Sequence, residues 1–124
     1  MKPYEFEQLV CDHYRQKGYR VQTTSASNDY GIDVFAEKKG EKIAVQVKMY
    51  GGSTRKVNRQ TMMELYGAAA YFDCTKAVLA TDGEVLTDAK EVAHKLGIDI
   101  LFIQPDRKIS MPVSYTHLRA HETK

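Results

Sequence analysis

Two apolar segments flanking a short turn constrain the fold of this chain more than any other feature. Residues 31–37 (GIDVFAE) and 42–49 (KIAVQVKM) alternate apolar and polar side chains, as β-strands do. The four residues between them, KKGE, are typical of a hairpin turn. The pattern therefore predicts an antiparallel strand pair. Three polar residues stand inside these strands and require an explanation: Asp33, Gln46 and Lys48.

The rest of the chain predicts three helices and three further strands. The helices are expected at residues 4–17, 57–72 and 87–96, and the strands at residues 19–24, 76–81 and 98–103. Pro3 suits a first helical turn, Gly18 suits a helix end, and Thr87 can cap the third helix. The order α-β-β-β-α-β-α-β favours an α/β fold with a central mixed five-stranded sheet flanked by helices. The first three strands would form an antiparallel meander, and helical crossovers would add the last two.

Composition and length indicate the class of protein. The chain has 124 residues, enough for one domain with one core, and 43% of them are apolar and 27% charged, as in an ordinary globular protein. No apolar run approaches the roughly 20 residues of a membrane-spanning helix, and no signal-peptide pattern opens the chain. Cys11 and Cys74 match no metal-site spacing and favour a reduced, cytoplasmic setting.

The C-terminal stretch VSYTHLRAHET differs in character from the rest of the chain. It is similar to the in-frame translation of a transposase adaptor used in sequencing libraries. We therefore expect a native domain over residues 1–112 and a non-native tail over residues 113–124, with the natural sequence differing after about Pro112. His117 and His121 stand four residues apart, as metal ligands on a helix can, but they belong to this tail.

The polar strand residues are expected to converge at one end of the sheet. Gln46 and Lys48 lie two residues apart, so they project from the same face of their strand. Asp33 lies on the neighbouring strand, across the turn, within reach of Gln46. Glu7 falls within the apolar arc of the first helix, where a carboxylate needs a partner because an unpaired buried charge is costly.

Two carboxylates, an amide oxygen and a lysine suggest a divalent-metal site for phosphodiester hydrolysis. Mg²⁺ prefers oxygen ligands, and it polarises a phosphate and acidifies a bound water. A lysine can orient that water and offset the developing negative charge. Structural roles are the alternative: Asp33 can end a turn, and Gln46 with Lys48 can form the solvated face of an edge strand. Glu7 can pair with Arg20 or Lys48.

The chain also resembles the restriction-endonuclease-like fold, the PD-(D/E)xK nuclease superfamily, and within it the Mrr-like catalytic domain of type IV restriction enzymes. The resemblance covers roughly residues 3–103 and is carried by the segments EFEQLV, KGYRVQ, NDYGIDV, AVQVKMY, ELYGAAAY and VLATDGEVLTDAKEVA. It implies that Asp33 is a direct metal ligand, that Gln46 occupies the second acidic position, and that Lys48 is the catalytic lysine. Glu7 would support the metal or its waters.

The same resemblance implies an outer-shell role for Asp29 and a close backbone passage at Gly31. The implied cofactor is Mg²⁺, with Mn²⁺ as the alternative. Gln46 departs from the acidic motif, because a neutral amide removes one negative charge and should weaken metal affinity. A Mn²⁺ preference, a dependence on bound DNA and a degenerate nuclease are the three readings of that departure.

The implied function is a divalent-metal-dependent DNA endonuclease of the Mrr-like restriction type. Two alternatives remain, a structure-specific nuclease similar to archaeal Holliday-junction resolvases and a catalytically silent DNA-binding module. Phosphate contacts are expected from the basic loop after the third strand, through Arg55, Lys56 and Arg59, although a solvated loop has the same composition. Gln60 can face the same cleft.

Two further features bear on partners. Tyr30 and Tyr50 flank the polar motif and can either stack on a base or sugar or pack in the core or at its rim. No segment resembles a sequence-reading element such as a helix-turn-helix. Target choice would therefore come from a homodimer, from a separate recognition domain or subunit, or from a longer natural protein.

Overall fold

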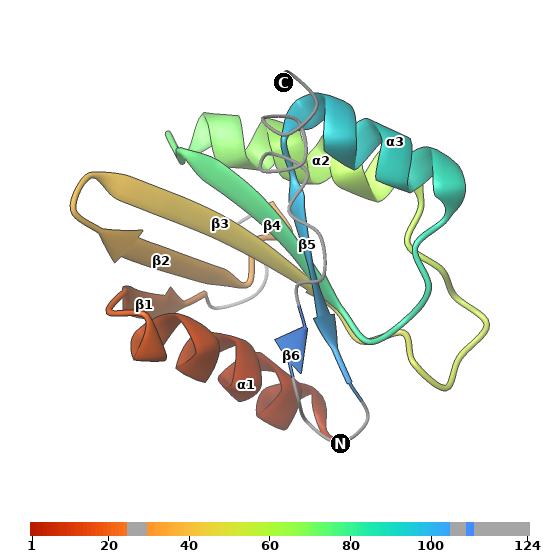
Figure 1. The fold of residues 1–124 in the computed structure, drawn as a ribbon, viewed down its shortest axis with the longest axis horizontal. Coiled ribbons are helices and arrows are strands. Elements are labelled where there is room, and N and C mark those ends of the chain that lie inside the picture. Colours follow the sequence, from red (N-terminus) through yellow and green to blue (C-terminus); the bar gives the residue numbers. More distant parts are fainter. Residues whose placement is uncertain (25–29, 105–108, 111–124) are drawn as a thin grey trace, which may run out of the picture.

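A mixed β-sheet with helices on both faces forms the protein in this computed structural model (Figure 1). The structure describes residues 1–24, 30–104 and 109–110. The strands lie in the sheet in chain order: β1 (Arg20–Thr23), β2 (Val34–Lys38), β3 (Glu41–Lys48), β4 (Lys76–Thr81), β5 (Asp99–Ile103) and β6 (Ile109–Ser110). The helices are α1 (Pro3–Gln16), α2 (Arg59–Tyr71) and α3 (Thr87–Leu96).

The predicted α/β fold is confirmed in its element order and strand pairing. β1, β2 and β3 form an antiparallel meander, and β4 and β5 are added in parallel through the crossover helices α2 and α3. The short strand β6 lies antiparallel to β5 and extends the five predicted strands to six. Thr87 is the first residue of α3 and Leu86 holds the N-cap position, so the expected Thr87 cap is wrong. The tail expected over residues 113–124 lies outside the described residues.

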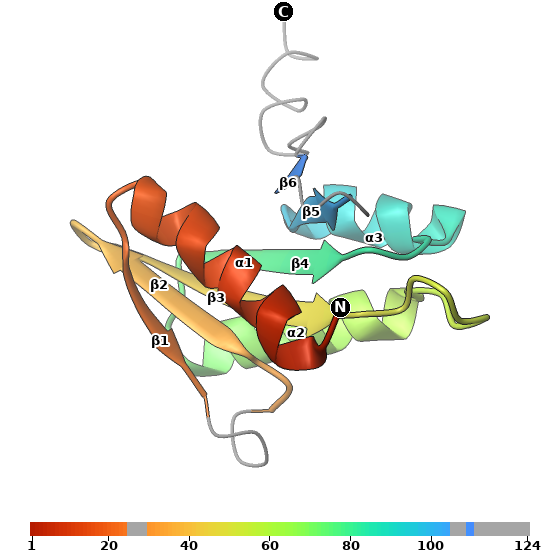
Figure 2. The ribbon, with the colours of Figure 1, turned by 90° about the horizontal axis from the view of Figure 1, so that it is seen from below.

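The helices divide into two layers. α1 covers one face of the sheet, and α2 and α3 cover the other (Figures 1 and 2). Along β3, Ile43 and Val45 pack in the core beneath α1, whereas Ala44 packs in the core beneath α2 and α3. Because side chains alternate along a strand, Gln46 and Lys48 share the face of Ala44. Within the described residues, no helix is long and apolar enough to cross a bilayer.

A two-residue turn joins β2 to β3, as predicted. Lys39 and Gly40 have φ of +46° and +80°. Positive φ at both positions is the type I′ conformation, whose twist matches that of the flanking strands. The antiparallel pairing that starts at this turn continues as far as Val34, opposite Val45. β3 then runs on to Lys48, past the end of its pairing with β2.

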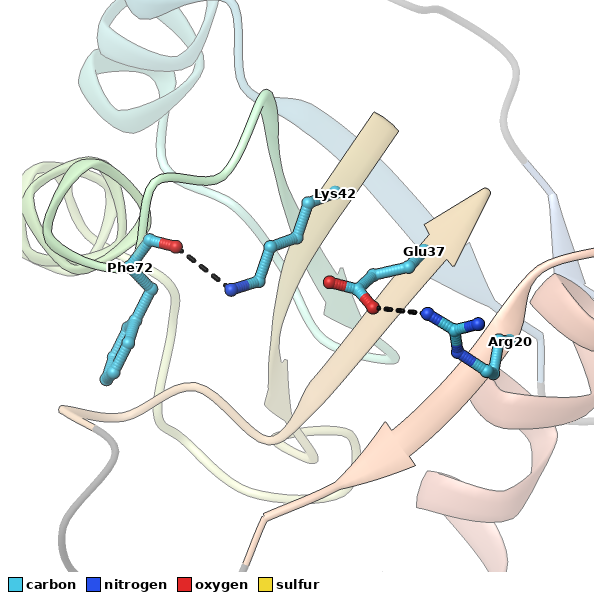
Figure 3. A network of polar contacts seen from close by, with 4 residues as sticks. All are labelled: Arg20, Glu37, Lys42 and Phe72. Carbon is cyan, nitrogen blue, oxygen red and sulfur yellow. Dashed lines mark hydrogen bonds and ion pairs between the residues drawn. The ribbon is translucent and has the colours of Figure 1, made fainter. Parts of the chain in front are cut away.

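Near the start of β3, charged side chains bind to groups of the fold (Figure 3). Lys42 Nζ donates to the Phe72 carbonyl oxygen at 3.0 Å and lies 5.1 Å from the centroid of the Phe35 ring. Glu37, the cross-strand neighbour of Lys42, accepts from Arg20 Nη2 at 2.9 Å. Each of these charged groups therefore has a partner within the fold.

Candidate active site

The candidate site lies where β2 separates from β3. Asp33 leaves the regular ladder there: its N–H donates to the Val45 carbonyl at 2.9 Å, and its Oδ2 accepts from the Val47 N–H at 2.7 Å. The carboxylate thus takes the place of a backbone acceptor in the widening gap between the strands. The Asp33 carboxylate is therefore bound to β3 at Val47, the residue between Gln46 and Lys48 in the chain.

The environment of Asp33 makes its negative charge costly. Burial raises the pKa of the Asp33 carboxyl, and the Val47 hydrogen bond and the positive charge of Lys48 offset only part of that effect. Within the described part of the chain, no hydrogen bond engages the second carboxylate oxygen, Oδ1. A bound cation would stabilise the ionised form.

Glu7 approaches Asp33 from α1. It is half-buried, and burial together with the negative charge of Asp33 raises the pKa of Glu7. The two carboxylates are therefore close enough to repel each other, as the helical position of Glu7 predicts. The alternative pairing of Glu7 with Arg20 is not observed, because Arg20 binds Glu37 instead.

Gln46 supplies an unsatisfied oxygen. Its side chain is 7% exposed, and its Oε1 is buried without a hydrogen-bond partner among the described residues. Leaving such an acceptor unpaired costs about 1–3 kcal/mol. Its Nε2 lies against Gly31, where an added Cβ would approach to 2.9 Å; with a φ of +86°, Gly31 permits this close passage.

Lys48 ends β3 and has no ion pair within the described part of the chain. Its Nζ lies 5.9 Å from the centroid of the Tyr50 ring. Thr81, fully buried on the neighbouring strand β4, donates its hydroxyl to the Lys48 carbonyl at 2.7 Å and so holds the strand end in place. The backbone of Lys48 is therefore held in place, and its side-chain amine has no ion pair among the described residues.

These residues fit a divalent cation by their chemistry. Two carboxylates and an orphaned amide oxygen form an oxygen-rich set of the kind that Mg²⁺ prefers. Over residues 1–24, 30–104 and 109–110, no three His, Cys, Asp or Glu side chains gather as a metal cluster. Gln46 is an amide and supplies a neutral oxygen in place of a carboxylate.

The basic loop after β3 meets the site through Tyr50. The Arg55 guanidinium lies 4.5 Å from the centroid of the Tyr50 ring, the same ring that Lys48 approaches. Tyr50 therefore packs at the rim between two cations, one of the two roles expected for it. Arg55 is exposed and, among the described residues, is free of carboxylate partners.

The other two cations expected to contact DNA already have acidic partners. Lys56 lies 3.6 Å from Glu84, and Arg59 lies 3.4 Å from Asp88. All four side chains are solvent-exposed, so these pairs contribute little stability and can exchange a carboxylate for a phosphate.

The remaining expected residues lie to either side of the centre. Gln60 Nε2 donates to Glu64 Oε2 at 3.1 Å along α2, and Glu64 lines a pocket that also contains Gln46. Gln60 is therefore linked to that pocket through Glu64, and its expected role in the cleft stays a prediction. Asp29 lies outside the described residues.

Sequence reasoning missed two supports of the site. Asp82 Oδ1 accepts from the Gly51 N–H at 2.7 Å, and an added Cβ on Gly51 would meet Asp82 Oδ2 at 2.6 Å, so the basic loop is anchored to the end of β4. Thr81 is the second. The Thr-Asp-Gly sequence that follows the apolar run of β4 was the available signal.

Comparison with known proteins identifies the family. The family model Mrr_cat, described as a restriction endonuclease, matches residues 1–109. The chain belongs to the Mrr_cat restriction endonuclease family. The Mrr-like resemblance seen in the sequence is therefore confirmed, and the polar cluster at the end of β3 lies within a nuclease-type domain.

Relatives of this Mrr_cat domain extend beyond its length. The uncharacterized protein y4cE of Sinorhizobium fredii is 34% identical over 98 residues, which cover 70% of this chain but only 25% of y4cE. Among solved structures, the protein of unknown function AF1548 has a TM-score of 0.63 at 20% identity, covering 77% of this chain and 56% of that one. The MspJI restriction endonuclease in complex with a 27-mer oligonucleotide has a TM-score of 0.51 at 15% identity, covering 76% of this chain and 23% of that one. At these identities the structural matches show the fold alone.

Proposed function

We propose that this Mrr_cat domain is a divalent-metal-dependent DNA endonuclease of restriction type, with Glu7, Asp33, Gln46 and Lys48 as its active site. The observation that carries the proposal is the buried, unpartnered Oε1 of Gln46, next along β3 to the backbone N–H that binds the Asp33 carboxylate. A stable fold normally satisfies such groups, and this orphan stands one residue from the N–H that binds Asp33, whose charge acts on Glu7; together they indicate a ligand site.

Asp33 and Gln46 would hold a Mg²⁺ or Mn²⁺ ion, and Glu7 would support it from α1. When bound, such an ion supplies Lewis-acid polarisation of the scissile phosphate and a more acidic water. Lys48 would orient the attacking water and stabilise negative charge that develops on the phosphate oxygens. The Val47 N–H keeps Asp33 in position, and the Thr81 hydroxyl keeps the backbone of Lys48 in position.

DNA is the proposed substrate. Arg55, next to Lys48 on the Tyr50 ring, would contact a backbone phosphate, and Lys56 and Arg59 would extend that contact. The solved complex of MspJI, which shares the fold, contains an oligonucleotide and supports this choice. Target choice would come from a homodimer or from a separate recognition domain. Two free thiols, Cys11 and Cys74, favour a cytoplasmic setting.

The test is nicking of supercoiled plasmid and cleavage of a labelled four-way junction, each with Mg²⁺, with Mn²⁺ and with chelator. We expect metal-dependent nicking that disappears in Lys48→Ala and persists in Lys42→Ala, a matched lysine change on the same strand face. Preferred cutting of the junction would instead assign a structure-specific nuclease. Absence of cutting by a folded protein that still binds DNA would assign a silent DNA-binding module and implicate Gln46.

A further inference from the structure

A pocket of about 560 Å³ opens beside Gln46. It lies between the Gly31 segment and α2, and its volume is within the range of small-ligand sites. Gln46 is the one proposed active-site residue that lines it, together with Tyr30, Gly31, Glu64, Gly67 and Tyr71.

Two exposed aromatic rings stand among the lining residues. Tyr30 is 66% exposed and Tyr71 is 67% exposed, and their ring centroids lie 5.1 Å apart in an edge-to-face contact. Tyr30 also has a φ of +52°, a left-handed conformation that is uncommon for a residue other than glycine and is favoured at ligand sites. A large apolar ring held at the surface in this way offers a stacking face.

Apart from the two tyrosine hydroxyls, the polar side chains among the lining residues supply one donor and one acceptor. Gln46 Nε2 lies against Gly31 and is the donor, since the amide oxygen is buried. The Glu64 carboxylate, which accepts from Gln60 at 3.1 Å, is the acceptor. Its negative charge disfavours a phosphate in this pocket. A planar group that carries both a donor and an acceptor on one edge, and that stacks on a tyrosine, fits these features.

We propose that this pocket receives one unpaired nucleobase of the bound DNA, stacked on Tyr30 and hydrogen-bonded to Gln46 Nε2 and Glu64. Nucleobases combine a π-face with adjacent donors and acceptors, and enzymes that extrude a base read it by this pair of contacts. The inference rests on the proposed function, since it takes DNA as the ligand. Gln46 then links the pocket to the active site, because it lines the pocket and belongs to the proposed active site.

The test compares binding of two labelled duplexes by the full chain in chelator, where no cleavage occurs. One duplex is fully paired and the other carries a single bulged adenine. We expect the bulged duplex to bind at least about fivefold more tightly, the lower end of what stacking one base on an aromatic ring contributes. Equal affinity of the wild-type protein for both duplexes overturns the inference.

Gly67→Phe is the blocking variant. Gly67 is exposed, lines the pocket and has no atom within 4 Å of an added Cβ, so we expect a phenylalanine there to fill the pocket. We expect it to abolish the preference for the bulged duplex while leaving affinity for the paired duplex within twofold. Met63→Phe is the matched control, because Met63 is exposed on the same helix and is not among the pocket-lining residues named above. Loss of the preference in both variants, or in neither, contradicts the proposal.

Two further arms separate this inference from its alternatives. Lys48→Ala should retain the preference for the bulged duplex. If the wild-type protein prefers the bulged duplex but does not cleave DNA with either metal, the nuclease proposal is refuted and the pocket proposal stands. A protein that cleaves normally without the preference refutes the pocket alone. Free adenosine at millimolar concentration should leave the melting temperature unchanged, and a rise that Gly67→Phe removes would assign the pocket to a free nucleoside and overturn the DNA proposal.

Discussion

The two ends of strand β3 present lysines on the same face, and the fold treats them differently. At the first end, Lys42 donates to the Phe72 carbonyl and packs over Phe35, and its neighbour Glu37 is bound by Arg20 (Figure 3). At the second end, Lys48 has no carboxylate partner within the described residues, and the neighbouring Gln46 oxygen is orphaned. One strand therefore carries a satisfied polar network and an unsatisfied one.

The difference separates structural polar groups from functional ones. Each end has a lysine on the same face of the same strand, so the strand face cannot explain the difference between the two lysines. A structural polar group is hydrogen-bonded or ion-paired within the fold. A ligand-binding group is left unsatisfied in the free protein and lowers its stability. The solvated-edge reading of Gln46 and Lys48 is also inconsistent with the position of β3, which lies between β2 and β4.

The largest expected effect is that of Asp33→Asn. The amide oxygen can still accept from the Val47 N–H, so the change removes charge and little else. We expect plasmid nicking to fall at least about 100-fold, the lower range for losing one preorganised electrostatic group. The free energy of unfolding without metal should rise by about 0.5–2 kcal/mol, because a costly charge is removed from a functional site.

Glu37→Gln is the counterpart of that change at the satisfied end. It should leave nicking unchanged and lower the free energy of unfolding by at most about 1 kcal/mol, because the Arg20 pair is exposed. Chemical denaturation monitored by circular dichroism measures both variants. If Asp33→Asn lowers the free energy of unfolding and leaves nicking unchanged, the polar groups at the two ends of β3 do not differ in role.

Gln46→Glu should increase the difference between the two ends of β3, because it adds a negative charge that the amide lacks. A third carboxylate strengthens attraction for a divalent cation, and we expect the Mg²⁺ concentration for half-maximal nicking to fall about tenfold. Without metal the variant should melt at a lower temperature than the wild type, because three carboxylates then repel one another. An unchanged Mg²⁺ requirement would place the amide outside the metal's reach.

Arg55→Ala should weaken DNA binding more than any other single change in the basic loop. Arg55 is free of a carboxylate partner, whereas Lys56 and Arg59 have one each. We expect the slope of log affinity against log salt to fall by about 1, as for one lost phosphate contact. Arg20→Ala, near the satisfied end, is the control and should leave that slope unchanged. Equal slopes for both variants would exclude Arg55 from the interface.

Lys42→Ala should affect stability alone. The lost hydrogen bond to the Phe72 carbonyl and the contact with Phe35 correspond to about 1–2 kcal/mol of unfolding free energy. Nicking per folded molecule should match the wild type. A loss of nicking comparable to that of Lys48→Ala would show that the two lysines do not differ in role.

Most of the fold could be predicted from the sequence because its signals are local. Alternation in β3 and the Lys-Lys-Gly-Glu turn locate the hairpin, and helical periodicity locates the crossovers. Strand β6 was beyond this reasoning, because two residues carry no periodicity. The Thr87 cap failed for a related reason: residue type favours a cap, but the chain path decides which residue precedes the helix.

Part of the candidate site could likewise be predicted from the sequence, and part could not. Asp33, Gln46 and Lys48 stand out as polar residues in apolar strands, and Glu7 stands out on its helix. The Val47 N–H is invisible to sequence reasoning, because every residue except proline carries one. The pocket beside Gln46 is invisible too, since it depends on where α2 lies over the Gly31 segment.

The turn at Lys39 and Gly40 has a consequence for how the protein folds. Asp33, Gln46 and Lys48 belong to the one hairpin that this turn closes, and hairpins form within about 1–10 μs, well before contacts that are distant in sequence. Most of the site can therefore take shape from short-range contacts, and Glu7 joins when α1 docks. Substitutions of the buried side chains of α3 and β5, such as Ala93 and Leu101, should lower the population of folded molecules while leaving each folded molecule fully competent.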